Sequence, residues 1–220
     1  MKQKAKHTLT PKLRFPEFRD AGEWARKPLT TLFHFQDGFA FKSTDFVDSN
    51  MDEAIQVVRI ADINNQNMNG QKIYVPKGLV ETLGLERYLV KNGDLLLSLT
   101  GAAGFNFFFW NGGLALLNQR TCKIIPKHDA DYPLLRLLEP MVHDRLNARG
   151  EGQNNNLSKE FLGTTDILVP KTIEEQQKIA DCLTYIEELI AVQAEKLDAL
   201  KDHKKGLMQQ LFPSPEAKGA

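Results

Sequence analysis

The chain has 220 residues, of which 42% are hydrophobic and 25% charged, so it can fold around a core of its own. Its formal net charge is zero, which argues against a general nucleic-acid coat protein. Because it contains neither a signal peptide nor an apolar run of about 18 residues, we expect a cytoplasmic protein without a membrane segment and with reduced thiols at its two cysteines.

Residues 1–20 are predicted to form an extended arm. Its last part, TPKLRFPEFRD, places two prolines among alternating apolar residues. Proline restricts its own backbone and that of the residue before it, which disfavours a helix.

Residues 21–170 are predicted to form a mixed α/β (α+β) domain that is rich in β-strands. Short apolar runs bounded by Asn, Gly and Pro predict strands at 55–60, 72–75, 94–100, 105–110, 121–125 and 166–169. Leu134, Leu138, Met141 and Val142 keep helical spacing and predict a helix over 132–149. We expect Pro140 to kink or split that helix.

Residues 171–213 are predicted to form one long coiled-coil helix, followed by a flexible tail over 214–220. Thr172 and Glu175 have the spacing of a capping box, and Phe212-Pro213 ends the helical pattern. From residue 173 to residue 211 the helix would be about 58 Å long. A domain of about 150 residues is only some 30 Å across, so much of this helix must project from it.

An apolar stripe with alternating steps of three and four residues runs along this helix, as in a coiled-coil heptad. Its apolar members are Ile179, Leu183, Ile186, Ile190, Leu197, Leu200, Leu207 and Leu211, and Gln193 and Lys204 occupy the same register. One helix does not bury such a stripe alone, so we expect these ten positions to pair with a partner helix. The alternative is that the helix packs on its own domain.

Motifs for catalysis are missing. SLTGAAGF (98–105) resembles a loose glycine-rich loop but lacks the complete dinucleotide-binding pattern and the lysine of a P-loop. The five histidines form no metal-ligand pattern, and neither cysteine has the setting of a nucleophile. We therefore predict no catalytic residue, no metal and no cofactor for this chain.

Polar loops offer the chemistry of DNA recognition instead. Asn and Gln pair bidentately with adenine, Arg and Lys with guanine, and Ser, Thr and backbone N–H groups hold phosphates. For any one loop, Asn and Gly can equally be turn formers. The predicted DNA-facing residues are Lys42, Ser43, Arg59, Asn64, Asn65, Thr100, Asn106, Gln119, Arg120, Asn154 and Lys159.

The sequence resembles the DNA-specificity subunit of type I restriction–modification systems. The resemblance rests on stretches in the same order along the chain, from residue 11 to residue 213. They are PKLRFPEFRDAGEW, DGFAFKSTDF, VVRIADI, KNGDLLLSLTGAAG, LLNQRTCKIIP, GQNNNLSKEFLGTTDILVPKTIEEQQKIADCL and LDALKDHKKGLMQQLFP.

The resemblance implies a non-catalytic subunit in which 21–170 is a target-recognition domain that reads half of a split site in double-stranded DNA. It also implies that the long helix docks methyltransferase subunits, which bind S-adenosylmethionine and methylate adenine, and that a translocating restriction subunit joins the full complex. As shared family sequence, GQNNNLS would shape the hinge before the helix or touch phosphate rather than select bases.

One departure from the family concerns size, because such subunits have two recognition domains and two helices, and this chain has one of each. The chain is then either a half-subunit or a piece cut from a longer subunit. A half-subunit implies an antiparallel homodimer with a symmetric, interrupted target, or pairing with a different half-subunit. A second hypothesis is an assembly or decoy protein that binds methyltransferase subunits through its coiled coil without productive DNA recognition.

Overall fold

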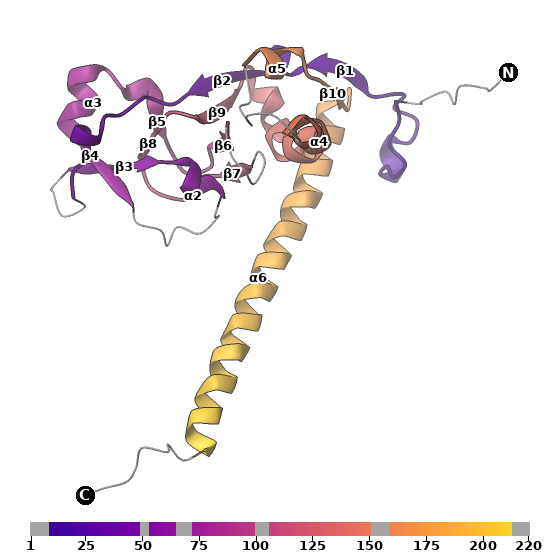
Figure 1. Ribbon diagram of the computed structural model, residues 1–220. Helices are drawn as coiled ribbons and strands as arrows, with labels where there is room; N and C mark the ends of the chain where they lie inside the picture. The colour runs from indigo at the N-terminus through magenta and orange to yellow at the C-terminus, as the bar shows by residue number, and fades with distance from the viewer. Residues whose placement is uncertain (1–8, 49–52, 65–71, 100–105, 151–158, 213–220) are drawn as a thin grey trace, which may run out of the picture.

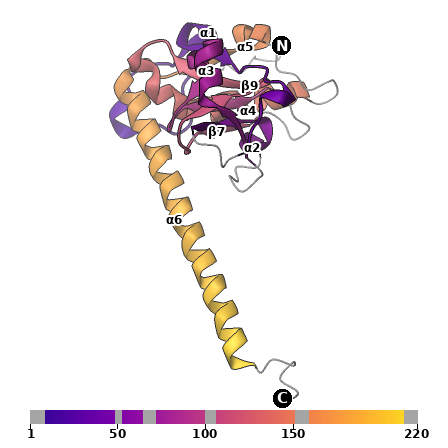
Figure 2. The same cartoon turned by 90° about the vertical axis from the view of Figure 1, so that its left-hand side faces the viewer.

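A computed structural model describes residues 9–48, 53–64, 72–99, 106–150 and 159–212 of the chain. A mixed domain of strands and short helices occupies one end, and helix α6 (Ile173–Leu211) projects from it as a single long rod (Figure 1). The view turned by 90° shows the same separation between the domain and the far end of α6 (Figure 2). This is the α+β fold with a long C-terminal helix that the sequence predicts.

Ten strands lie in the described residues, in three sheets. They are β1 (Ala25–Pro28), β2 (Phe33–Asp37), β3 (Ala54–Val58), β4 (Ile73–Pro76), β5 (Leu89–Val90), β6 (Leu95–Ser98), β7 (Phe107–Phe109), β8 (Ala115–Leu117), β9 (Thr121–Pro126) and β10 (Asp166–Val169). One four-stranded sheet has the order β2-β9-β6-β7 and the other β4-β3-β8-β5, while β1 and β10 form an antiparallel pair. Among these strands, all pairings are antiparallel except that of β3 with β8.

The helices besides α6 are mostly short. They are α1 (Leu29–Leu32), α2 (Ile60–Asn64), α3 (Lys77–Leu83), α4 (Tyr132–Gly150) and α5 (Lys159–Thr164). Single 3₁₀ turns are η1 (Pro16–Phe18), η2 (Ser43–Asp45), η3 (Glu86–Tyr88) and η4 (Asp129–Asp131). The described part of the expected arm, residues 9–20, contains bends at 9–10 and 12–13, the turn η1 and a further turn at 19–20, and none of these residues belongs to a strand.

The largest core cluster joins the first sheet to the helices. Leu97 and Ile124 from the sheet pack with Leu134 and Leu138 of α4, and all four are at most 3% exposed. Ala180 in α6 also belongs to this buried cluster, which anchors the start of the long helix on the domain. Two smaller core clusters cover the two faces of the second four-stranded sheet, β4-β3-β8-β5. Successive side chains along β3 and β8 point to opposite faces, so each strand contributes to both clusters.

The predicted elements agree with the structure except in the short segments. All six predicted strands and the helix over 132–149 are present, and α4 runs through Pro140 without a break. β1, β2, β5 and β8 and the short helices α1, α2, α3 and α5 have too few residues to show a clear period in the sequence. Residues 60–64, expected to belong to a strand and a polar loop, form α2 because Asp62 accepts a hydrogen bond from the Arg59 N–H at 2.7 Å.

Candidate nucleic-acid interface and pairing helix

Strand register brings most of the loops with predicted DNA-facing residues to one end of the two four-stranded sheets. β3 ends at Val58 beside Leu117, the last residue of the parallel strand β8. β9 begins at Thr121 beside Ser98, the last residue of β6. We call this end the loop rim and define it by the described residues 37–39, 59, 99, 106 and 118–120.

Backbone contacts tie these loops together. The Phe39 N–H donates to the Leu117 carbonyl at 2.8 Å, and the Gln119 N–H donates back to the Phe39 carbonyl at 2.8 Å. A Cβ atom on Gly38 would lie 1.9 Å from the Asn118 carbonyl oxygen, so only glycine permits this close approach. The loop rim is therefore held together by main-chain contacts between loops that are far apart in the sequence.

Four of the predicted DNA-facing residues meet at the loop rim: Arg59, Asn106, Gln119 and Arg120. Gln119 and Arg120 are exposed. Arg120 has a backbone φ of 65°, a left-handed conformation that is uncommon for any residue other than glycine. Arg59 is half-buried, and its Nε lies 3.4 Å from the Asp62 carboxylate. The Arg59 guanidinium is therefore paired with the Asp62 carboxylate.

The other predicted residues are placed elsewhere or are outside the described residues. Lys42 and Ser43 are exposed at η2, which precedes a bridge from Val47 to Tyr74 at the outer edge of the second sheet. Lys159 begins α5, which packs against α1 at the end of the first sheet opposite the loop rim. Asn64 is the last residue of α2. Asn65, Thr100 and Asn154 lie outside the described residues.

The predicted pairing stripe is exposed along most of α6. Ile186 and Ile190 are 46% and 63% exposed, and every later apolar member lies between 42% and 72%. Gln193 and Lys204 are exposed in the same register. Ile179 and Leu183 differ from the other eight positions, because they are half-buried against the chain's own core, beside α4. The first two turns of the stripe thus pack on the domain, and the later members are exposed among the described residues.

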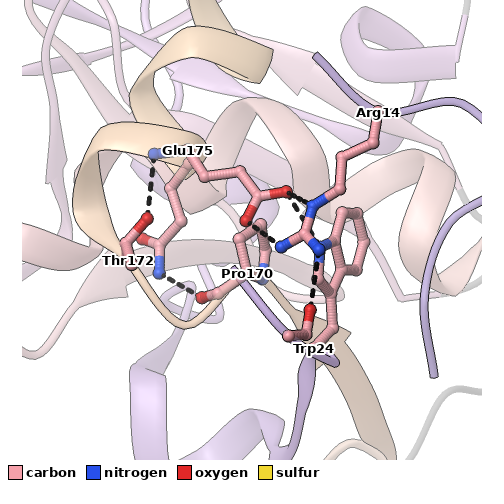
Figure 3. Close-up of polar contacts among 7 residues, drawn as sticks. Arg14, Trp24, Pro170, Thr172 and Glu175 are labelled. Atoms are coloured by element: carbon pink, nitrogen blue, oxygen red, sulfur yellow. Dashed lines mark hydrogen bonds and ion pairs between the residues drawn. The ribbon is translucent and has the colours of Figure 1, made fainter. Parts of the chain in front are cut away.

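A buried ion pair between the N-terminal arm and the start of α6 was not anticipated from the sequence (Figure 3). Nε and Nη2 of Arg14 each donate to the Glu175 carboxylate at 2.7 Å, and the Trp24 indole donates to it at 3.2 Å. This hydrogen bonding raises the pKa of the Arg14 guanidinium above its ordinary value. Arg14 also donates to the Gly22 carbonyl at 2.7 Å. The arm is therefore fixed on the helix.

Only one of the two hydrogen bonds of the predicted capping box is present. Thr172 accepts a hydrogen bond from the Glu175 N–H at 3.3 Å, as expected. The Glu175 carboxylate, which would return to the Thr172 N–H in a full capping box, is bonded to Arg14 and Trp24 instead. A glutamate three residues after the cap was the sequence signal for this site, but nothing in the sequence linked it to an arginine 161 positions earlier.

An apolar groove of about 560 Å³ lies between the arm and α6. Leu13 and Phe15 line it from the arm, Trp24 lines it from the segment just before β1, and Ile179, Leu183 and Ile186 line it from the helix. Leu13 is 91% exposed, so the groove opens to the surface. The groove is continuous with the exposed stripe, because Ile186 belongs to both.

Three further observations bear on chemistry. Cys122 is buried and Cys182 exposed, and neither of these two described cysteines forms a disulfide. In the part of the chain that the structure describes, no group of three or more His, Cys, Asp or Glu side chains is placed to hold a metal ion. None of the described helices combines the length and the apolar character that a membrane crossing requires.

Comparison with known proteins decides the family. The family model described as the type I restriction modification DNA specificity domain matches residues 21–202, which cover the mixed domain and most of α6. The chain belongs to this family.

Individual relatives resemble the chain in sequence over part of its length or in fold. The EcoBI specificity subunit of a type I restriction enzyme from Escherichia coli is 33% identical over 110 residues, which are 48% of this chain and 20% of that protein. The S subunit from M. genitalium superposes with a TM-score of 0.59 at 13% identity and covers 90% of this chain. The HsdS subunit from Thermoanaerobacter tengcongensis gives 0.53 at 17% identity over 84% of this chain.

The chain spans about half the length of these structural relatives or slightly less. It covers 48% of the M. genitalium chain and 41% of the T. tengcongensis chain. A further structure, reported for complex assembly and conformational transition of the type I R-M system, has a TM-score of 0.60 at 16% identity, with 92% of this chain and 47% of that chain covered. At these low sequence identities, the TM-scores show that the chain shares the fold of these structures.

Proposed function

We propose that this chain is the non-catalytic DNA-specificity subunit of a type I restriction–modification complex and that it acts as an antiparallel homodimer. Each copy reads one half of a bipartite site in double-stranded DNA. The observation that carries the proposal is the exposed apolar stripe of α6, which follows one specificity domain and has no partner helix among the described residues. A second copy supplies both a cover for the stripe and the second recognition domain.

The loop rim supports the part of the proposal that concerns DNA. Gln119 and Arg120 project from a turn fixed by main-chain contacts, and these side-chain types hydrogen-bond adenine and guanine edges in the major groove. Arg59 and Asn106 lie on the adjoining strand ends. A rigid strand scaffold with polar loops at one end is a common arrangement for recognition. A two-fold dimer of this chain reads half-sites related by the same two-fold axis.

A second apolar face of α6 supports docking of methyltransferase subunits. Tyr185, Leu189 and Val192 are 61%, 44% and 58% exposed. At 100° per residue they lie roughly a quarter turn around the helix from the stripe. They therefore remain available when the stripe pairs with a second copy. The methyltransferase subunits bind S-adenosylmethionine, and a translocating restriction subunit completes the complex.

Methylation mapping tests this function. The purified chain is mixed with its cognate methyltransferase subunit and S-adenosylmethionine, and modified adenines are mapped on genomic DNA by single-molecule sequencing. We expect a palindromic motif interrupted by a spacer of fixed length. An asymmetric motif would show that a different half-subunit is the partner.

A binding series separates recognition from assembly alone. The affinity of the chain for a duplex with the mapped motif is compared with its affinity for a scrambled duplex at several salt concentrations. We expect a preference for the motif and a decline in affinity with salt, because phosphate contacts release counterions. A stable complex with the methyltransferase subunit that neither methylates DNA nor prefers the motif would overturn the proposal in favour of a decoy.

A further inference from the structure

We infer that the two α6 helices pair in one register, with Gln193 of each copy opposite Lys204 of the other, and that the partner's helix end docks in the groove under the N-terminal arm. This inference rests on the proposed homodimer and adds its register and its end contact. It follows from the order of side chains along the stripe and from the position of the groove.

Antiparallel pairing over the whole exposed stripe produces matched layers. Ile186 faces Leu211, Ile190 faces Leu207, Gln193 faces Lys204 and Leu197 faces Leu200. Every apolar member thus meets an apolar member, and the two polar members meet each other. A shift by one heptad would place Gln193 and Lys204 against apolar residues, and burying a polar group without a partner is unfavourable. Polar core positions commonly set register in this way.

Charge favours the antiparallel direction. Residues 186–198 of α6 carry four carboxylates and one lysine, whereas residues 199–211 carry three lysines and one carboxylate. Antiparallel helices place the acidic half of one copy beside the basic half of the other. Parallel helices would place like charges together and would stack the two Lys204 side chains in one core layer, which is unfavourable.

This register brings the partner's helix end to the groove. Leu211 of the second copy lies level with Ile186, which lines the groove and forms the last layer before the arm. Leu211 and Phe212 are 72% and 68% exposed in the single chain. Leu13 and Phe15 line the arm side of the groove, so the groove presents apolar side chains to the apolar helix end of the second copy. The Arg14–Glu175 ion pair fixes the arm side of the groove on α6.

Disulfide trapping tests the register. Cysteine is introduced as Gln193→Cys or Lys204→Cys in a Cys182→Ala background, which removes the exposed native thiol. The two proteins are oxidised with copper phenanthroline, separately and after mixing and subunit exchange. We expect a disulfide-linked dimer only in the mixture. In the inferred register, position 193 of one copy and position 193 of the other are about 11 residues apart along the axis, or roughly 16 Å, which is beyond disulfide reach.

Three other outcomes are distinct from the expected one. Cross-linking of each variant alone would show parallel helices and overturn the inference. No cross-link in any sample, with a dimer in sedimentation, would overturn the register and leave the homodimer intact. A monomer in sedimentation before any substitution would overturn the homodimer itself, and the inference with it.

A double-mutant cycle tests the docking of the helix end. We measure the dimer Kd for Leu13→Ala, Phe212→Ala and the pair. Each single change should raise Kd about tenfold, because two symmetry-related contacts lose apolar burial, and the pair should raise it by less than the product. Leu83→Ala, at a residue 48% exposed on α3, is the control and should combine with Phe212→Ala additively. Additive behaviour of Leu13 and Phe212 would overturn the docking contact.

Discussion

Two charges placed in the exposed stripe of α6 should abolish pairing and leave the domain folded. The variant is Ile190→Glu with Leu197→Glu. Both residues lie on the projecting part of the helix, beyond the turns that pack on the domain. Glutamate has a good helix propensity, so the helix itself should tolerate both changes.

The size of the effect follows from how much surface pairing has still to bury. Ile190 and Leu197 remain 63% and 54% exposed in the single chain. Complete burial of such a side chain contributes about 1.5–3 kcal/mol, so the share still available is about 1–2 kcal/mol each. A symmetric dimer contains four of these side chains, which gives about 4–7 kcal/mol. At about 1.4 kcal/mol per tenfold, Kd should rise by about 10³–10⁵, before the added cost of burying carboxylates.

Sedimentation equilibrium over a range of concentrations measures this change, and thermal unfolding followed by circular dichroism reports on the domain. The matched control is Ala191→Glu with Gln209→Glu, which adds the same charge at exposed positions on the far side of the helix. The control should pair normally. A stripe variant that dimerises as tightly as the control would refute the reasoning, because pairing would then use another surface.

Other substitutions probe the loop rim and the second face of α6. Gly38→Ala should lower the free energy of unfolding by about 1–3 kcal/mol in urea titrations, because the new methyl group collides with the Asn118 carbonyl. Arg120→Gly should be about 1 kcal/mol more stable than Arg120→Ala, because glycine accepts the positive φ. Both changes should weaken DNA binding by about 1–3 kcal/mol and relax the sequence preference at one position of the half-site. Tyr185→Asp with Val192→Asp should preserve the dimer and abolish binding of the methyltransferase subunit in pull-down assays.

The sequence by itself determined the long-range plan of the chain. The stripe from Ile179 to Leu211 predicts most of α6, a helix of 39 residues, because helical periodicity is a local property that many residues repeat. Stronger apolar runs, such as 121–125 and 166–169, likewise predict β9 and β10. The hydrogen-bonding chemistry of the polar loops could also be predicted, because it depends on residue type alone.

Only the tertiary structure decided which distant residues meet. The β3–β8 and β6–β9 registers bring four residues together at the loop rim: Arg59, Asn106, Gln119 and Arg120. Lys159 begins α5 at the opposite end of the first sheet, β2-β9-β6-β7. Arg14 meets Glu175 across 161 positions for the same kind of reason. Such contacts depend on burial of the whole core, and no local pattern specifies them.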